Sequence, residues 1–124
     1  MNEKELEIEK QFKTLFSWAI DGGFSYEYTY EKGGDSSCSY IYRFRKGKDF
    51  FDLRELSGGE ELNFVVYKDG QYRFPSLKAR YPKEFRSFKF KHLFKKPTKE
   101  EKRAFFADIL RKEWTATDFF GFKN

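Results

Sequence analysis

The sequence predicts an α+β fold: an N-terminal helix, a five- or six-stranded antiparallel meander sheet and a C-terminal helix. Three observations predict this order. Apolar residues recur with helical spacing in the first 20 residues and again after residue 98, they alternate with polar residues between 24 and 75, and glycine-bearing turns separate the alternating runs. A chain of 124 residues is the size of one domain, so we expect a single domain over residues 1–124.

The N-terminal helix is predicted from a single apolar face. Its members follow the i, i+4, i+7, i+8, i+11 spacing and are Ile8, Phe12, Leu15, Phe16 and Ala19. Asn2 can cap the first turn of this helix. The run Asp21-Gly22-Gly23 is expected to end it, because glycine accepts the left-handed conformation of a C-terminal cap.

Five alternating runs are predicted to be strands: 24–31, 38–45, 50–56, 61–67 and 72–75. The turns between them predict the register, because a slip of one residue turns a whole strand over. A three-residue loop, Gly33-Gly34-Asp35, would pair Tyr30 with Cys38, Tyr28 with Tyr40 and Tyr26 with Tyr42.

The three later turns predict the remaining pairs. The turn Gly47-Lys48 would pair Phe44 with Phe51, Tyr42 with Leu53 and Arg43 with Asp52; Gly58-Gly59 would pair Leu53 with Phe64 and Phe51 with Val66; Asp69-Gly70 would pair Tyr67 with Tyr72 and Val65 with Phe74. The first three turns then agree on one aromatic face, which the N-terminal helix is expected to cover. The last hairpin adds an apolar end to the opposite face.

The region 76–96 is harder to interpret than the rest. Phe88, Phe90, His92 and Phe94 alternate with lysines, so we expect a short helical turn followed by a strand. The final helix is expected to begin at a capping box of Thr98 and Glu101. Its apolar stripe comprises Phe106, Ile109, Leu110 and Trp114. The tail 117–122 is too aromatic for a free linker and is expected to dock on the domain or on a partner.

The residues that carry catalysis are scarce, so we expect no enzyme, no cofactor and no metal. One histidine and one cysteine exclude the usual zinc sites built from His pairs or Cys clusters. Cys38 falls within a predicted strand on the aromatic face, which favours a buried thiol over a nucleophile paired with His92. Glycine pairs lie in hairpin turns, and no phosphate-binding loop is present.

The same features suggest where the chain resides. A lone cysteine rules out an internal disulfide, and the sequence holds neither a secretory leader nor an apolar run long enough to span a bilayer. We therefore expect a cytoplasmic protein that does not associate with membranes.

Charge is unevenly distributed along the chain. Residues 1–62 hold 9 basic and 13 acidic side chains, whereas residues 63–124 hold 16 and 7. Such asymmetry points to an anionic partner, or to a homo-oligomer assembled head to tail. Within the basic half, cations interleaved with aromatic rings can follow a phosphate backbone while the rings stack on bases. The same Phe-Lys alternation is also typical of an edge strand protected by lysines.

These observations predict a non-catalytic binding module whose basic C-terminal half engages an anionic partner, either nucleic acid or an acidic protein surface. The candidate binding residues are Lys83, Arg86, Lys89, Lys91, Lys95, Lys96, Lys99, Lys102 and Arg103, together with Phe119 and Phe120 of the tail. One alternative is a stoichiometric inhibitor or immunity-type protein of a mobile element, which would recognise a protein through that tail. A second alternative is a module that binds a small phosphorylated ligand between the sheet and the last helix.

Overall fold

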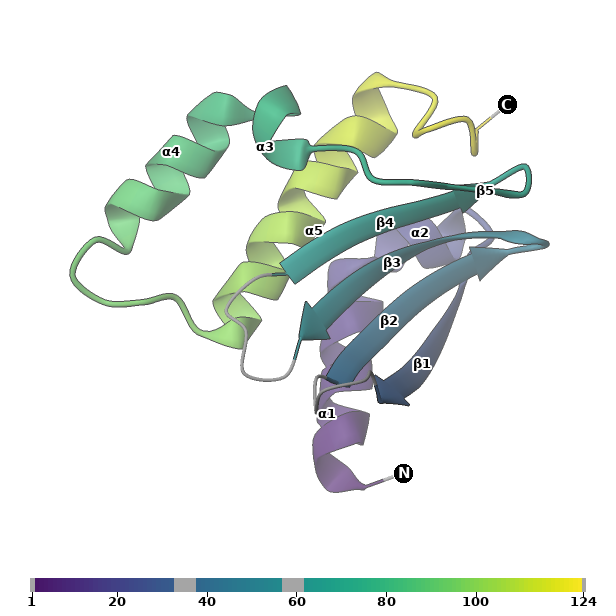
Figure 1. The fold of residues 1–124 in the computed structure, drawn as a ribbon, viewed down its shortest axis with the longest axis horizontal. Coiled ribbons are helices and arrows are strands. Elements are labelled where there is room, and N and C mark those ends of the chain that lie inside the picture. Colours follow the sequence, from purple (N-terminus) through teal and green to yellow (C-terminus); the bar gives the residue numbers. More distant parts are fainter. Residues whose placement is uncertain (1, 33–37, 57–61, 124) are drawn as a thin grey trace. The chain divides into compact units, whose positions relative to one another are not determined.

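The computed structural model describes residues 2–32, 38–56 and 62–123 (Figure 1). The chain falls into two compact units, Met1–Pro75 and Ser76–Asn124. The described residues form five helices and five strands, which confirms the α+β class predicted from the sequence. The expectation of a single domain over residues 1–124 stays a prediction.

The first unit begins with two short helices in place of the one predicted helix. They are α1 (Glu3–Leu15) and α2 (Ser17–Asp21). Asn2 caps α1 as expected, because its side-chain oxygen accepts a hydrogen bond from the Glu5 backbone N–H at 2.8 Å. The break falls at Phe16, whose φ of −108° and ψ of 31° lie outside the helical range. After α2, Gly23 turns the chain with a φ of +99°, a conformation that favours glycine.

The sheet of the first unit is an antiparallel meander (Figure 1). Its strands are β1 (Ser25–Lys32), β2 (Cys38–Lys46), β3 (Asp49–Leu56), β4 (Leu62–Lys68) and β5 (Gln71–Arg73). They lie in the spatial order β1-β2-β3-β4-β5, so each strand pairs with the next along the chain. The predicted topology is therefore confirmed, with five strands.

The register is confirmed at three hairpins and wrong at the first. The predicted pairs Phe44–Phe51, Tyr42–Leu53, Arg43–Asp52, Leu53–Phe64, Phe51–Val66 and Tyr67–Tyr72 all form. The ladder between β4 and β5 ends at Val66–Arg73, one pair before the predicted Val65–Phe74. The turn Gly58-Gly59 lies outside the described residues.

The first hairpin is shifted by two residues from its prediction. Tyr28 pairs with Tyr42 and Tyr30 with Tyr40, whereas Tyr40 and Cys38 were the predicted partners. The predicted loop, Gly33-Gly34-Asp35, lies outside the described residues. The error has a simple cause, because a shift of two residues keeps every side chain on its own face. The alternation of tyrosines could therefore identify the face but not the partner.

Helix α1 covers the aromatic face of the sheet, as predicted (Figure 1). The ring centroids of Phe12 and Tyr42 lie 4.4 Å apart, and those of Phe16 and Phe44 lie 4.7 Å apart. Apolar side chains of this layer that are completely buried include Phe12, Phe16, Phe44, Phe51, Leu53 and Val66. The burial of these aromatic rings provides most of the hydrophobic stabilisation of the first unit.

The opposite face of the sheet combines an ion-pair network with an aromatic cluster. Asp52 is completely buried and accepts hydrogen bonds from Arg43 at 2.8 and 3.0 Å and from Arg54 at 3.0 and 2.7 Å. Phe50 stacks on Tyr67 with 4.9 Å between ring centroids. This cluster is the apolar end of the second face that the Asp69-Gly70 hairpin predicted.

The second unit is helical throughout its regular structure. Its helices are α3 (Leu77–Arg80), α4 (Pro82–Lys91) and α5 (Lys99–Ala116). Helix α4 corrects the expectation of a strand after the helical turn. Pro82 occupies the first turn of α4, where its missing N–H costs nothing. Phe85 and Phe88, three residues apart, share the face that contacts Phe105.

Helix α5 begins as predicted and the tail folds back onto it. Thr98 accepts from the Glu101 N–H at 3.1 Å, and the Glu101 carboxylate accepts from the Thr98 N–H at 3.0 Å, which completes the capping box. Phe119 of the tail is completely buried and lies edge-on to Trp114 at 5.5 Å between centroids. Among the residues described, no helix has the length and apolar character that crossing a membrane requires.

Candidate functional site

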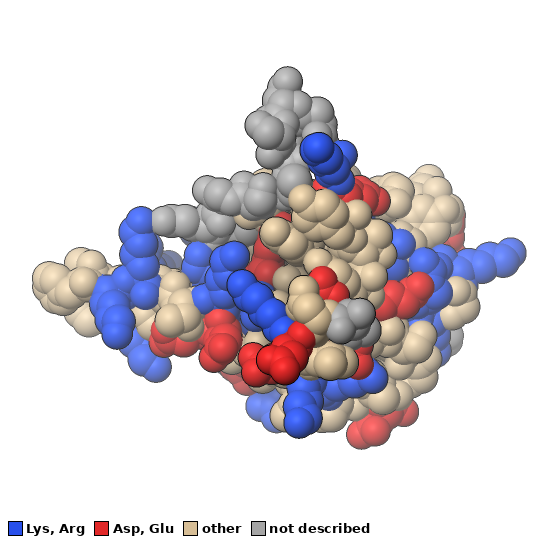
Figure 2. All heavy atoms as spheres, turned by 90° about the horizontal axis from the view of Figure 1, so that it is seen from below, with Lys and Arg blue, Asp and Glu red and all other residues tan. Residues whose placement is uncertain are grey.

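The basic character of the second unit is concentrated between α4 and the start of α5. From Phe85 to Lys99 the sequence holds six cations and no aspartate or glutamate. Figure 2 shows several Lys and Arg side chains on its left, in the region where Figure 1 draws α4. This stretch brings together most of the binding residues predicted from the sequence.

The structure divides the predicted binding residues into accessible and inaccessible ones. The side chains at seven positions are exposed: Lys83, Arg86, Lys89, Lys91, Lys95, Lys96 and Lys99. Lys102 and Phe120 are half-buried. Arg103 is only 5% exposed and Phe119 is completely buried, so neither offers a surface to a partner in this conformation.

Several of the exposed cations form no ion pair with the side chains that the structure describes. Over residues 2–32, 38–56 and 62–123, Lys83, Arg86, Lys89 and Lys95 form no ion pair with any side chain. Lys91 differs, because its charge lies near Glu101. The Thr98 backbone N–H and, to a smaller extent, Lys91 hold the pKa of the Glu101 carboxyl below its ordinary value.

Three apolar side chains project beside these cations, and none of them is among the binding residues predicted from the sequence. Phe90 is 77% exposed, Leu93 is 59% exposed and Phe94 is completely exposed. Phe90 was expected to be a core residue of a strand, which is wrong, because in a helix it lies on the side away from Phe85 and Phe88. A helical projection of 82–91 places Phe90 with Lys83 and Arg86, and that signal could have found it.

We call this surface the basic tip. It comprises Lys83, Arg86, Lys89, Phe90, Leu93, Phe94 and Lys95.

Contacts between α4 and α5 hold the basic tip on the second unit. Phe88 stacks on Phe105 with 4.2 Å between ring centroids, and Phe85 lies edge-on to the same ring at 4.9 Å. The Nζ atom of Lys112, near the end of α5, lies 3.7 Å from the Oε2 atom of Glu84, at the start of α4. Helices α4 and α5 are therefore antiparallel neighbours, and the outer face of α4 is free to present its cations.

A buried carboxylate joins α3, α5 and the tail. Glu113 is only 3% exposed and accepts hydrogen bonds from Arg80 at 3.0 and 3.1 Å, from the Tyr81 hydroxyl at 2.9 Å and from Thr117 at 3.1 Å. Burial raises the pKa of Glu113, but the hydrogen bonds from Arg80 and Tyr81 outweigh it and hold this pKa below its ordinary value. Burial and the bond to Glu113 raise the pKa of Tyr81 to about 12. The group is fully hydrogen-bonded, which is typical of a structural role.

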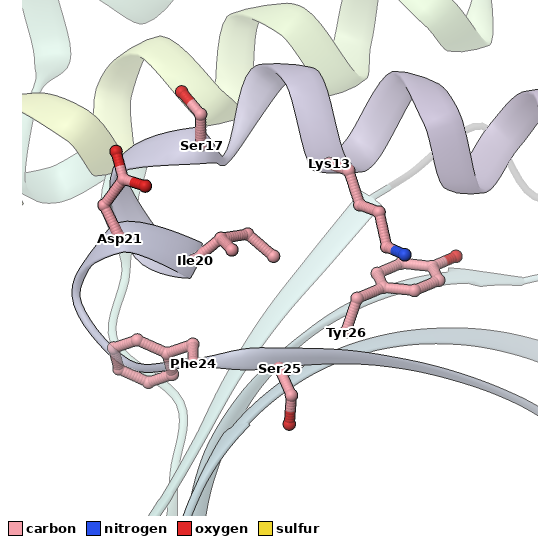
Figure 3. Close-up of a pocket in the computed structure, with 7 residues that line it drawn as sticks. All are labelled: Lys13, Ser17, Ile20, Asp21, Phe24, Ser25 and Tyr26. Carbon is pink, nitrogen blue, oxygen red and sulfur yellow. The ribbon is translucent and has the colours of Figure 1, made fainter.

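The first unit contains an open cavity of about 430 Å³ between its helices and the start of β1 (Figure 3). Its lining residues are Lys13, Ser17, Ile20, Asp21, Phe24, Ser25 and Tyr26. Figure 3 shows the Lys13 side chain reaching the Tyr26 ring, while the polar atoms of Ser17 and Asp21 lie on the far side from both rings.

The predicted environment of Cys38 is not tested, because its side chain lies outside the described residues. The expectation that this thiol is buried, in preference to acting as a nucleophile paired with His92, stays a prediction. Within the described part of the chain, no group of three or more His, Cys, Asp or Glu side chains is arranged to hold a metal ion.

No family model, no curated protein and no solved structure matches the chain.

Proposed function

We propose that the chain is a non-catalytic binding module whose basic C-terminal half engages an anionic partner, and that this partner is nucleic acid. The observation that carries the proposal is the set of unpaired cations on the basic tip. Lys83, Arg86 and Lys89 stand exposed on one helix, without an acidic side chain near enough for an ion pair within the described residues. Phosphates along a nucleic-acid backbone match such a row, and their condensed counterions are released on binding.

The contrast with the first unit strengthens this proposal. Arg43 and Arg54 form ion pairs with Asp52. The Nε atom of Arg45 lies 2.6 Å from the Oε2 atom of Glu27. The first unit carries 11 basic and 14 acidic side chains, whereas the second carries 14 and 6. The excess positive charge of the chain therefore lies in the unit where several cations form no ion pair with a described side chain.

The tail supports the alternative of a protein inhibitor less well. Phe119 has no exposed surface, and the Arg80 guanidinium lies 5.1 Å from the centre of the half-buried Phe120 ring. Both rings are thus engaged within the second unit. A role in recognising a protein would require the tail to leave this position.

The test is the salt dependence of nucleic-acid binding by the full chain. If four cations contact phosphates, the logarithm of the affinity should fall against the logarithm of salt concentration with a slope of about −2.8 on single strands or about −3.6 on duplexes. The double variant Lys89→Gln/Lys95→Gln should reduce the slope by about half, because it removes two of the four contacts. Fluorescence anisotropy of labelled oligonucleotides between about 50 and 200 mM salt measures this.

The matched control is Lys4→Gln/Lys10→Gln, which removes the same charge from exposed positions of α1. It should leave the slope unchanged. An absence of binding at about 50 mM salt, or an affinity indifferent to salt, would overturn the proposal and favour a protein partner.

A further inference from the structure

The two exposed rings of the basic tip are not needed by the core of the second unit. Phe85 and Phe88 already fill the contact with Phe105, whereas Phe90 is 77% exposed and Phe94 is completely exposed. Leu93, between them in sequence, is 59% exposed. Single exposed apolar residues are normal on protein surfaces, but here three of them lie within five residues of sequence, next to exposed cations, and such a concentration of apolar surface suggests a binding site.

We infer that the basic tip binds single-stranded nucleic acid, with bases stacked on Phe90 and Phe94 while the neighbouring cations contact the phosphates. This inference rests on the proposed function and names its substrate class. It also gives Phe90 and Phe94 a role, because contacts between cations and phosphates do not involve them.

The placement of cations around the rings fits such a mode. Lys83, Arg86 and Phe90 are three and four residues apart and share one face of α4. With a rise of about 1.5 Å per residue, Arg86 lies about 6 Å and Lys83 about 10 Å from Phe90 along the helix axis. Phe94 is followed directly by Lys95. Each ring thus has a cation within reach of the phosphate beside a base that stacks on it.

The rings also discriminate between the anionic partners that the charge alone would accept. In a duplex the base faces are already stacked on one another, so Phe90 and Phe94 would find none to contact without distorting the helix. Single strands offer free base faces, and stacking on aromatic side chains is their usual mode of non-specific recognition.

A membrane surface and an acidic protein fit the basic tip less well. An interfacial helix buries its apolar face in the lipid, but Phe85 and Phe88 of α4 are engaged with Phe105. Protein interfaces are depleted in lysine, whereas five of the six cations between Phe85 and Lys99 are lysines. Lysine is by contrast a frequent ligand of phosphate, where it acts as a point charge.

The experiment measures binding of the full chain to an oligothymidine of about 12 nucleotides and to a duplex of the same length. We expect the single strand to bind more tightly than the duplex. The double variant Phe90→Leu/Phe94→Leu, which keeps apolar bulk but removes the aromatic faces, should weaken single-strand binding by about tenfold or more. Its salt slope should stay that of the unchanged protein. Proton resonances of both rings should move upfield when the oligothymidine is added.

Three controls separate stacking from other causes. Phe74→Leu alters a ring of the first unit that is equally exposed, at 73%, and should leave the affinity unchanged. Leu93→Ala removes apolar surface without a ring and should change single-strand affinity by less than about twofold. Circular dichroism melts should show that none of these variants unfolds, because all four side chains are largely exposed.

Failure of this inference and failure of the proposed function give different results. Salt-dependent binding with equal affinity for duplex and single strand, or with no effect of Phe90→Leu/Phe94→Leu, would overturn stacking and leave the proposed function standing. No binding to either nucleic acid would overturn both. Tighter binding to anionic lipid vesicles than to the oligothymidine, abolished by Leu93→Ala, would assign the basic tip to a membrane surface.

Discussion

Asp52 and Glu27 show how burial changes the contribution of an ion pair. Both are strand residues that bind an arginine on the face of the sheet opposite α1. The Asp52 side chain is completely buried, and its partners Arg43 and Arg54 are 17% and 25% exposed. Glu27 and Arg45 are 43% and 34% exposed. Water screens the attraction between Glu27 and Arg45 but hardly reaches Asp52. Losing the Asp52 carboxylate should therefore destabilise the protein more than losing the Glu27 carboxylate.

We expect Asp52→Asn to lower the free energy of unfolding by about 3 kcal/mol, because it leaves two partly buried guanidiniums without their carboxylate. Glu27→Gln should lower it by less than about 1 kcal/mol. Urea denaturation at neutral pH measures both. Equal losses for the two variants would contradict the ion-pair network.

Helix α4 is the element whose identity most affects the candidate site. A strand would turn Phe88 and Phe90 to the same side, whereas the helix packs Phe88 against Phe105 and leaves Phe90 exposed. Phe88 lies 4.2 Å from Phe105 and 4.6 Å from His92 between ring centroids, while Phe90 is 77% exposed. Phe90 belongs to the basic tip because the helix places its side chain on the exposed face.

Truncating each ring tests this helix. Phe88→Ala should lower the free energy of unfolding by about 2 kcal/mol or more, because it opens a gap beside Phe105. Phe90→Ala should change it by no more than about 0.5 kcal/mol, as is usual for exposed positions. The two values come from urea denaturation monitored by circular dichroism. If Phe90→Ala lowered the free energy of unfolding as much as Phe88→Ala, the prediction of a strand would be favoured over the helix.

Glu113 links three elements of the second unit and makes their packing sensitive to acid. Its pKa in the folded protein lies below the ordinary value of 4.5, because Arg80 and Tyr81 stabilise its charged form against the opposing effect of burial. The unfolded chain therefore binds a proton here more readily than the folded one. The stabilisation is present above pH 4.5 and is lost as pH falls through the folded pKa.

We expect the free energy of unfolding to be maintained between pH 6 and about 4.5 and to decline as the pH is lowered below 4.5, through the folded pKa of Glu113. Glu113→Gln should be less stable than the unchanged protein at pH 6 and should lose less stability on acidification. Glu7→Gln, which alters an exposed acid of α1, is the control and should follow the curve of the unchanged protein. Parallel curves for Glu113→Gln and the unchanged protein would show that Glu113 is not the titrating group.

The chain as a whole combines two units of opposite charge. The first carries a net charge of −3 and the second a net charge of +8, from 11 basic against 14 acidic and 14 basic against 6 acidic side chains. The second unit, Ser76–Asn124, is shorter than the roughly 60 residues at which isolated domains are already marginal. That length favours a chain that folds as one cooperative body.

We expect a single thermal transition in calorimetry, with the calorimetric enthalpy equal to the van't Hoff enthalpy. Two resolved transitions would instead mean that the units unfold independently, and the prediction of one domain over residues 1–124 would be wrong. The measurement is best made at low and at high salt, because opposite charges on the two units would attract less when screened.

For the candidate site, the sequence predicted the cations but not which side chains around them are buried or exposed. Lys83, Arg86, Lys89 and Lys95 were identified from local charge alone, and charge density needs no knowledge of the fold. The burial of Arg103 and the exposure of Phe90 could not be read from composition, because both depend on which helix face meets a neighbour. The alternation in 88–94 fitted two periods over a short stretch, and only the contacts of Phe88 with Phe105 distinguish them.

The sequence by itself determined the α+β class, the order of the meander strands, the face of each strand and the caps at Asn2 and Thr98. These features depend on interactions between residues near one another along the chain, or on a period of two that a hairpin preserves. Only the tertiary structure decided that Tyr28 pairs with Tyr42 and that α4 is a helix. Both depend on contacts between residues distant in sequence, where alternatives of equal local quality differ only in the partners they bury.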